Sequence, residues 1–225
     1  MDKTKLAIEI FDAFAVQYQD KFMSLDLYHD SFDLFCQSVI KQNATVLELA
    51  CGPGNITKYL LQKRLDFNIL GTDLSPAMLA LAKANNPLAN FQLMDCRAID
   101  QLEDKYDGIV CGFGLPYLSR EEAIKFIQDA ATVLNPEGVL YLSTMEDDYH
   151  KSGFKTPSNG KGPQLYIHYH QADYLTQALH ESGFSIVDLS RQKYPETDGS
   201  ETTDLIILAK KQRIEAEKDR PLPQS

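Results

Sequence analysis

Two carboxylates end successive apolar runs, and their positions suit the binding of one nucleoside. Asp73 ends the run ILGTD, 19 residues after a turn built on Gly52 and Gly54, and Asp95 ends the run FQLMD. A carboxylate at the first place can accept hydrogen bonds from both hydroxyls of a ribose. One at the second place can accept an amino proton of an adenine ring. Taken singly, each acid is as readily a helix cap or a solvated charge, but together they predict a nucleoside site.

The turn before them follows a third acid. Glu48 lies near the end of the apolar run TVLEL, and the sequence continues as ACGPGNIT. Glycines at 52 and 54 allow a tight turn and a close approach of the backbone to a ligand. Alone, two glycines indicate no more than a turn between a strand and a helix. They gain weight because Asp73 and Asp95 follow at the ends of the next two runs.

The elements that position these residues alternate along the chain. Apolar residues at three- and four-residue spacing predict helix within residues 4–41. Short apolar runs then predict strands at residues 45–49, 67–72, 90–94, 107–112 and 138–144. Helices are predicted between them, two of which start at Ser75-Pro76 and at Ser119, where Glu122 completes a capping box. This alternation predicts an α/β fold with a parallel sheet covered on both faces.

The C-terminal part departs from that alternation. A predicted helix closes at Gly183, and the runs 184–189 and 203–209 follow with no helix between them. They predict an antiparallel pair that completes the sheet. We therefore expect one domain over residues 1–210, with a helical lid at 1–41 and a core at 42–210, and a charged, proline-rich tail at 211–225.

Composition narrows the class of protein. The chain has 225 residues, 44% of them hydrophobic, and a net charge of −10, which disfavours a nucleic-acid substrate. No apolar stretch suggests a signal peptide or a membrane helix, so we expect a cytoplasmic protein without a membrane partner. The four cysteines are far apart in sequence and predict buried thiols rather than disulfides or a zinc site.

Taken together, these motifs resemble the class I methyltransferases that use S-adenosylmethionine. ELACGPGNIT is similar to the first motif of that family, GTDLSPAML to the second, LMDCRAI to the third and YDGIVCGFGLPYL to the fourth. The resemblance extends over about residues 10–210. It implies a three-layer, Rossmann-like sandwich with a seven-stranded, mostly parallel sheet of order 3-2-1-4-5-7-6, in which strand 7 is antiparallel. It also implies S-adenosylmethionine as the cofactor.

The resemblance assigns one group of residues to the methionyl half of that cofactor. Glu48 would orient the first loop and the amino end, while Ala50 and Gly52 would offer backbone groups and Gly54 would complete the turn. Ala50 stands where a glycine is more typical. Tyr18 resembles the tyrosine of the family's helical lid and would contact the carboxylate, although a core aromatic residue explains it nearly as well.

A second group is assigned to the nucleoside and the sulfonium. Asp73 would bind the ribose, and Leu74 would lie beside the adenine. Asp95 and the backbone of Cys96 would bind the adenine edge. Phe113, just beyond the fourth strand, would lie near the sulfonium.

The acceptor side is less defined by sequence. The segments 112–119 and 145–174 should face the methyl group, and the second is predicted to be a mobile flap. Its LYIHYH stretch predicts a strand with Tyr166, His168 and His170 on one face. His168 and Tyr117 are candidates for a base or for orienting an acceptor hydroxyl, although a solvated loop explains each singly. A metal site lacks the partner ligands that one would need.

The predicted function is methyl transfer from S-adenosylmethionine to a small molecule by in-line displacement. One alternative is an NAD-dependent oxidoreductase, although Thr57 stands where the dinucleotide fingerprint has a third small residue. Another is a domain that binds the cofactor without catalysis and regulates a partner. The sequence leaves a monomer and a homodimer equally open.

Overall fold

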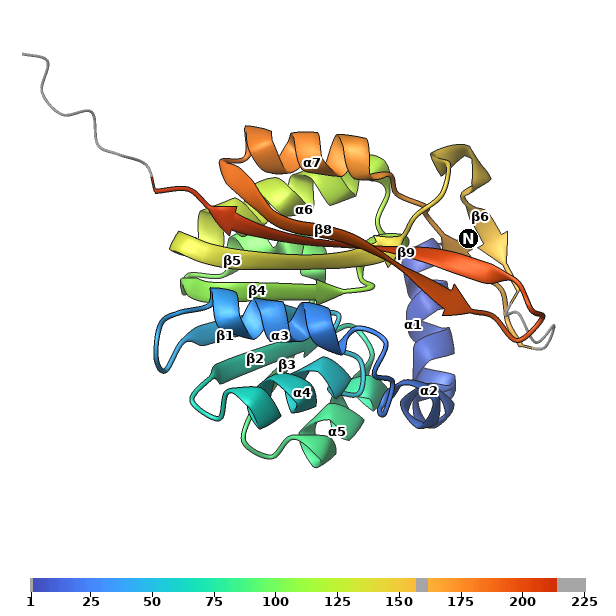
Figure 1. Ribbon diagram of the computed structural model, residues 1–225. Helices are drawn as coiled ribbons and strands as arrows, with labels where there is room; N and C mark the ends of the chain where they lie inside the picture. Colours follow the sequence, from blue (N-terminus) through green and yellow to red (C-terminus); the bar gives the residue numbers. More distant parts are fainter. Residues whose placement is uncertain (1, 157–161, 214–225) are drawn as a thin grey trace, which may run out of the picture.

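A seven-stranded sheet runs through the centre of the protein (Figure 1). The computed structural model describes residues 2–156 and 162–213. The strands of this sheet are β1 (Thr45–Leu49), β2 (Asn68–Asp73), β3 (Asn90–Leu93), β4 (Tyr106–Gly112), β5 (Leu134–Met145), β8 (Phe184–Pro195) and β9 (Glu201–Lys211). Their spatial order is β3-β2-β1-β4-β5-β9-β8, and β9 pairs antiparallel with both of its neighbours. Counted within this sheet, the order is 3-2-1-4-5-7-6, so the predicted fold is confirmed.

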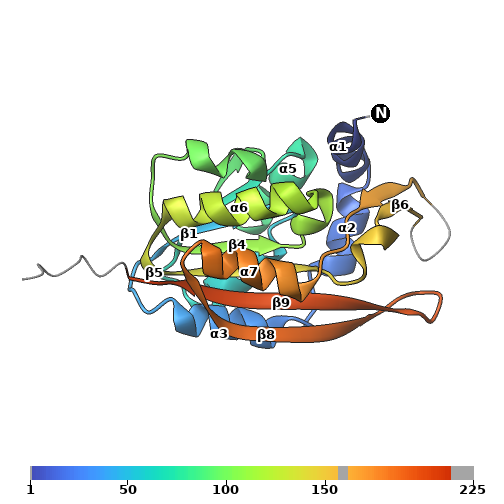
Figure 2. The same ribbon diagram turned by 90° about the horizontal axis from the view of Figure 1, so that it is seen from above.

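Helices cover both faces of the sheet (Figure 2). The helices α3 (His29–Ser38) and α4 (Asn55–Lys63) pack on one face, while α6 (Arg120–Val133) and α7 (Ala172–Glu181) pack on the other. Successive residues of a strand point to opposite faces. Val46 accordingly packs in the apolar cluster under α3 and α4, and Leu47 packs in the cluster under α6 and α7. Both residues are fully buried. The strands therefore read as continuous apolar runs.

The starts of two helices agree with the predicted caps. The helix α5 (Pro76–Asn85) follows Ser75, whose hydroxyl accepts a hydrogen bond from the Met78 N–H at 3.1 Å. The helix α6 follows Ser119, which forms a reciprocal capping box with Glu122. Each cap satisfies a free N–H group of the first turn and contributes about 1 kcal/mol to helix stability.

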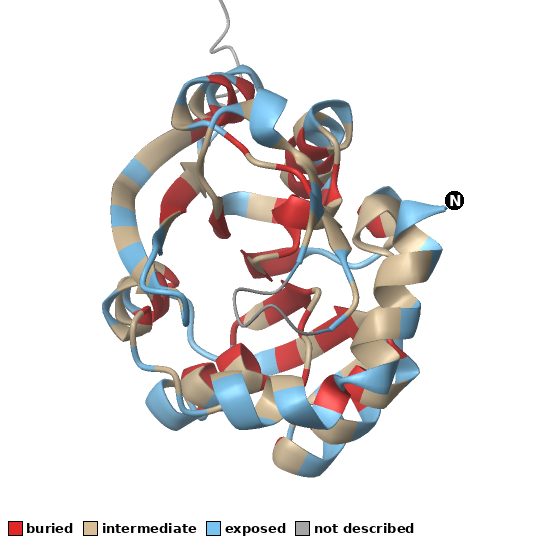
Figure 3. Cartoon of the chain, turned by 90° about the vertical axis from the view of Figure 1, so that its right-hand side faces the viewer, coloured by how far each residue is buried: buried red, intermediate tan, exposed pale blue. Residues whose placement is uncertain are grey.

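The N-terminal helices stand apart from the layers. The helices α1 (Lys3–Ala13) and α2 (Ala15–Phe22) lie at one end of the sheet, beyond the ends of β1, β2 and β4, while the β8–β9 hairpin extends past them (Figure 1). No residue of α1 is buried, as the tan and pale blue of this helix show in Figure 3. The helical region predicted at 4–41 thus forms three helices rather than one continuous element. The structure divides it near Phe14 and again before His29.

A small hairpin stands at the same end of the sheet as α1. The strands β6 (Gly153–Lys155) and β7 (Leu165–Ile167) pair antiparallel, after a short 3-10 helix η3 (Tyr149–Lys151). This region is the predicted flap, and residues 157–161 lie outside the described residues. The strand β7 ends at Ile167, so the predicted strand does not continue through His168 and His170; Tyr166 and His168 both line the cavity described below, and His170 does not. Both histidines are buried. The backbone N–H of His168 donates to the Pro116 carbonyl, and the backbone N–H of His170 donates to the Met145 carbonyl.

The remaining predictions concern the C-terminal tail, the four cysteine thiols, a metal site and a membrane-spanning helix. The strand β9 ends at Lys211, and the predicted tail lies outside the described residues from 214 onward. The four cysteines are free thiols, and three of them are buried. Within the described ranges, no cluster of His, Cys, Asp and Glu could hold a metal ion. No helix in those ranges is long and apolar enough to cross a membrane.

Candidate functional site

A cavity of about 660 Å³ opens between the strand ends and α1. We call the strand-end side the floor and the side formed by α1 and the β6–β7 hairpin the roof. Floor residues that line the cavity are Ala50, Gly52, Asp73, Leu74, Ser75, Met78, Met94, Cys96, Arg97, Gly112, Phe113 and Gly114. Roof residues that line it are Asp2, Lys3, Thr4, Ala7, Ile8, Phe11, Tyr166 and His168. Tyr18, Tyr117, Ser119 and Glu122 complete the wall.

The turn after β1 forms the part of the floor that the sequence predicted. Ala50 and Gly52 both have φ of +53°, and Gly54 has φ of +78°. A Cβ on Gly54 would lie 2.4 Å from Nδ2 of Asn86, so only glycine fits there. Ala50 adopts the left-handed conformation despite its methyl group, at a cost of roughly 1–2 kcal/mol. Phe113, at the end of β4, also has a positive φ of 56°. Such backbone strain concentrates at functional sites.

Asp73 presents its carboxylate to the cavity. One oxygen accepts the Gly52 N–H and the other accepts the Ser75 N–H, both at 2.9 Å. Burial raises the pKa of Asp73 above its ordinary value, against these hydrogen bonds. Each oxygen retains a further lone pair, and two ligand hydroxyls would stabilise the ionised form. This geometry fits the ribose role that the resemblance implies.

Glu48 lies behind the same turn and does not line the cavity. It is fully buried, and the Thr57 hydroxyl donates to its Oε2. Its Oε1 has no hydrogen-bond partner among the described residues. Burial raises the pKa of Glu48 to about 8, against the hydrogen bonds from Thr57. Glu48 is therefore mostly protonated at neutral pH, and a positive charge near the turn would favour its ionised form.

Asp95 is held by a neighbour rather than turned toward the cavity. The Arg97 side chain donates to Oδ1 of Asp95 at 3.0 Å, to Oδ2 at 2.7 Å, and also to Glu122 at 3.1 Å. Burial alone would raise the pKa of Asp95, but the hydrogen bonds from Arg97 lower it below its usual range. Cys96 and Arg97 line the cavity and Asp95 does not. The structure therefore brings Cys96, but not the Asp95 carboxylate, to the predicted adenine edge.

Two tyrosines and a phenylalanine join α1, α2 and the segment after β4. The Phe11 ring meets Tyr18 and Tyr117 edge-on, with centroids 5.8 and 5.3 Å apart. Burial and the nearby Asp73 charge raise the pKa of Tyr18 to about 12. Burial raises the pKa of Tyr117 as well. Both phenols stay protonated at neutral pH, so Tyr117 can orient an acceptor by hydrogen bonding but is poorly suited to be its base.

His168 is the other predicted candidate, and it also lines the cavity. Its Nδ1 lies 3.3 Å from the Tyr149 hydroxyl, and its ring lies against Tyr166 with centroids 4.8 Å apart. Burial lowers the pKa of His168, and the charge of Lys3 lowers it further. His168 is therefore neutral at pH 7.

Sequence reasoning foresaw a helical lid but did not identify its contacts. Asp12 of α1 accepts hydrogen bonds from the Ser75 hydroxyl and, at 3.0 Å, from the Ala77 N–H at the start of α5. At the other end of α1, the Lys3 ammonium lies 3.3 Å above the centre of the Tyr166 ring. These two contacts connect α1 to the floor at one end and to the hairpin at the other. The spacing of residues 3, 7, 8 and 11 places them on one helical face, and it could have identified the side of α1 that lines the cavity.

The fold and the cavity define a class: an α/β protein that binds a nucleoside at the carboxyl ends of its strands. The family described as "Methyltransferase domain" matches residues 46–138. An uncharacterized methyltransferase, OB1106 of Oceanobacillus iheyensis, is 30% identical over 144 residues, which cover 61% of this chain and 67% of that protein. Together with the strand-end motifs, this match shows that the chain belongs to the family of class I S-adenosylmethionine-dependent methyltransferases.

Two further similarities mark the limits of that assignment. Trans-aconitate 2-methyltransferase of Variovorax paradoxus is 32% identical over 110 residues, 49% of this chain and 42% of that protein. The magnesium protoporphyrin IX methyltransferase (ChlM) of Synechocystis PCC 6803, solved with bound SAM, shares the fold with a TM-score of 0.68 and 17% identity, covering 94% of this chain and 98% of that one. The match spans less than two thirds of several curated relatives, 36, 56 and 42% of three of them.

Proposed function

We propose that this protein binds S-adenosylmethionine in the cavity and transfers its methyl group to a small-molecule acceptor. The observation that carries the proposal is the Asp73 carboxylate. It faces the cavity with a free lone pair on each oxygen, beside a left-handed turn whose buried Glu48 lacks one partner. The two oxygens of the Asp73 carboxylate are the acceptors that the two hydroxyls of a ribose require.

The floor residues fit the two halves of that donor. In the proposed arrangement, Asp73 accepts the two ribose hydroxyls, and Leu74, Met78 and Cys96 enclose the adenine. The turn at Ala50 and Gly52 receives the methionyl part, with Tyr18 beside it. The Cβ that Gly52 lacks would stand 3.7 Å from the Tyr18 ring, so the turn and the lid meet around this part of the ligand.

For the methyl transfer itself, the main task of the protein is to position the donor and the acceptor. When bound, S-adenosylmethionine supplies a methyl group on a positively charged sulfonium, which the lone pair of an acceptor displaces in line. Phe113 and Tyr117 position the acceptor from the segment after β4, and Phe11 closes the cavity from the roof. Alignment and the exclusion of water are the main contributions of the chain. Tyr117 can donate a hydrogen bond to an acceptor oxygen.

The size and shelter of the cavity favour a small acceptor. About 660 Å³ is within the usual range of small-molecule sites and must hold both ligands. The relative from Variovorax paradoxus is named for trans-aconitate, a small molecule, which agrees with this class of acceptor. The net charge of −10 also disfavours nucleic acids. We retain the cytoplasm as the expected location, with a monomer or a homodimer as the assembly.

The test uses binding first and turnover second. Calorimetry should give micromolar dissociation constants for S-adenosylmethionine and its demethylated product S-adenosylhomocysteine, and no binding of NAD. Saturation at a hundredfold excess over the dissociation constant should stabilise the fold by about 2.7 kcal/mol. Binding of NAD with no response to either adenosyl compound would overturn the proposal. Binding of the donor without label transfer to any metabolite of a cell extract would favour the silent regulatory domain.

A further inference from the structure

Two histidines that follow β7 have the same kind of partner at Nδ1 but differ at Nε2. In His170, Nδ1 faces the Tyr174 hydroxyl, and Nε2 lies 2.8 Å from the Leu115 carbonyl oxygen. A carbonyl can only accept, so Nε2 of His170 carries the hydrogen and Tyr174 donates to Nδ1. In His168, Nδ1 faces the Tyr149 hydroxyl in the same way. Among the described residues, however, Nε2 of His168 has no partner.

The direction of the Tyr149 hydrogen bond follows from a third group. The backbone N–H of Arg120 points to the Tyr149 oxygen, at 3.4 Å, and an N–H can only donate. The Tyr149 hydrogen is then free to point to Nδ1 of His168, 3.3 Å away. Both contacts are long, but they agree in direction. Because the pKa of His168 is lowered, the ring is neutral, and its single hydrogen lies on Nε2. His168 therefore offers an N–H donor to the cavity.

Lys3 offers a second donor beside it. Its ammonium lies over the Tyr166 ring, which is itself adjacent to His168. Its charge acts on His168 strongly enough to lower that pKa. Among the described residues, Lys3 forms no ion pair with a carboxylate. A cation over an aromatic ring still has N–H groups available for an anion.

The other charged groups of the cavity wall are already engaged. Asp2 caps α1 by accepting from the N–H groups of Thr4 and Lys5. Arg97 and Glu122 are paired with each other, and Asp95 also binds Arg97. Asp73 is assigned to the donor. Of the acidic and basic side chains that line the cavity, Lys3 and His168 are thus the two left for another ligand, and both are donors.

We propose that Lys3 and His168 bind a carboxylate of the methyl acceptor, so that the acceptor is a small organic acid. This inference rests on the proposed function, because it places the acid in the part of the cavity that the donor leaves free. The rest of that part is apolar and aromatic, with Ala7, Ile8 and Phe11 on the roof and Tyr166 beside Lys3. An acid with a flat or unsaturated body suits these surfaces.

The test compares acids with their uncharged amides in the presence of saturating S-adenosylhomocysteine. The probes are acetate and acetamide, benzoate and benzamide, and trans-cinnamate and cinnamamide. The readout is the ¹⁵N resonance of His168 in histidine-labelled protein, which also reports the tautomer. We expect Nε2 to carry the hydrogen before any acid is added. At least one acid should then shift that resonance with an affinity about tenfold or more above that of its amide.

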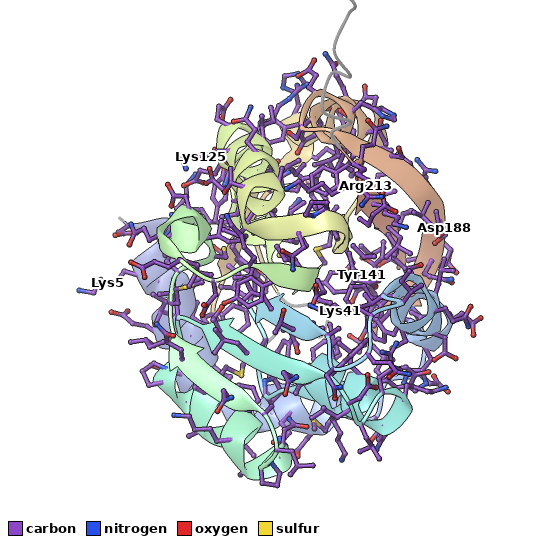
Figure 4. The ribbon with its side chains drawn as sticks, turned by 90° about the vertical axis from the view of Figure 1, so that its left-hand side faces the viewer. Lys5, Lys41, Lys125, Tyr141, Asp188 and Arg213 are labelled. Atoms are coloured by element: carbon purple, nitrogen blue, oxygen red, sulfur yellow. The ribbon has the colours of Figure 1, made fainter. Side chains whose placement is uncertain are left out.

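Variants separate a built site from general charge attraction. Lys3→Gln should abolish most of the preference for the acid, whereas Lys5→Gln should leave it intact. Lys5 lies on the same helix and projects away from the protein (Figure 4), and it does not line the cavity. The proposal fails if every acid and its amide bind equally, if no acid perturbs His168, or if the two lysine variants behave alike. If S-adenosylhomocysteine itself does not bind, the proposed function fails instead.

Discussion

The floor and the roof of the cavity are built in different ways. Floor residues follow the carboxyl ends of the parallel strands, and backbone hydrogen bonds fix the carboxylate of Asp73, which accepts from the N–H groups of Gly52 and Ser75. The roof helix α1 has no buried residue and is fastened mainly through Asp12 and Lys3. Elements with few buried contacts open at low free energy. We therefore expect the floor to be preformed as the proposed donor site and the roof to be the part that opens to exchange ligands.

The largest effect on stability is expected from a substitution that disrupts the glycine turn of the floor. Gly54→Ala forces a methyl group into Asn86, whose buried amide donates to the Gly54 and Ala82 carbonyls. Strain at a positive φ and the loss of those hydrogen bonds should together lower the free energy of unfolding by roughly 2–4 kcal/mol. Urea denaturation measures this loss.

Gly199→Ala is the matched control for that variant. Its φ is +83°, and nothing lies within 4 Å of the added Cβ. It should lose only the conformational part, roughly 1–2 kcal/mol. Equal losses in the two variants would show that the contact with Asn86 contributes nothing.

A second variant removes the proposed ribose contact of the floor, together with the hydrogen bonds from Gly52 and Ser75. Asp73→Ala should weaken the binding of S-adenosylhomocysteine by roughly 1.5–3 kcal/mol for each ribose hydrogen bond, reduced where water replaces the carboxylate. Calorimetry measures the affinity, and Asp104→Ala, an exposed acid outside the cavity, is the control. Unchanged affinity in Asp73→Ala would place the ribose elsewhere.

The third prediction concerns the pH dependence of the floor. Glu48 has an ordinary pKa of 4.5 and a pKa of about 8 in the fold, so the folded protein holds this proton more tightly than the unfolded chain. Its contribution to stability is complete below about pH 4.5 and is lost as the pH rises toward 8. The free energy of unfolding should fall by up to about 1.4 kcal/mol per pH unit in that window. Urea denaturation at several pH values should show this slope, and Glu48→Gln should flatten it. A slope that survives in the variant would assign the effect to another group.

The smallest effect should fall on the roof alone. Asp12→Ala removes a side-chain cap from α5, which should cost about 1 kcal/mol and loosen α1. Hydrogen exchange in residues 3–13 should become faster, while the strands keep their protection. Glu9→Ala, an exposed residue of the same helix, is the control. Faster exchange throughout the sheet would contradict the division between floor and roof.

Sequence reasoning reached the floor because its residues follow local rules. Apolar runs, the glycine turn and the acids at strand ends each depend on near neighbours in the chain, so Gly52, Asp73 and Cys96 were predicted and do line the cavity. The prediction for Asp95 did not foresee that Arg97, two residues away, would take up its carboxylate. Sequence spacing shows that two charged side chains can come into contact, but it does not show which of several possible partners each one binds in the fold.

The sequence by itself determined the sheet, its order through the resemblance, and most of the residues that form the floor of the cavity. Only the tertiary structure decided the roof. Asp12 accepts a hydrogen bond from Ala77 of α5, 65 residues away, and Lys3 lies over Tyr166. His168 lines the cavity, whereas the ring of His170 is bound to the Leu115 carbonyl and the Tyr174 hydroxyl. The reason is physical. Strand and helix periodicity is set by backbone geometry over a few residues, whereas these contacts join segments far apart in the chain and exist only once the core has placed them.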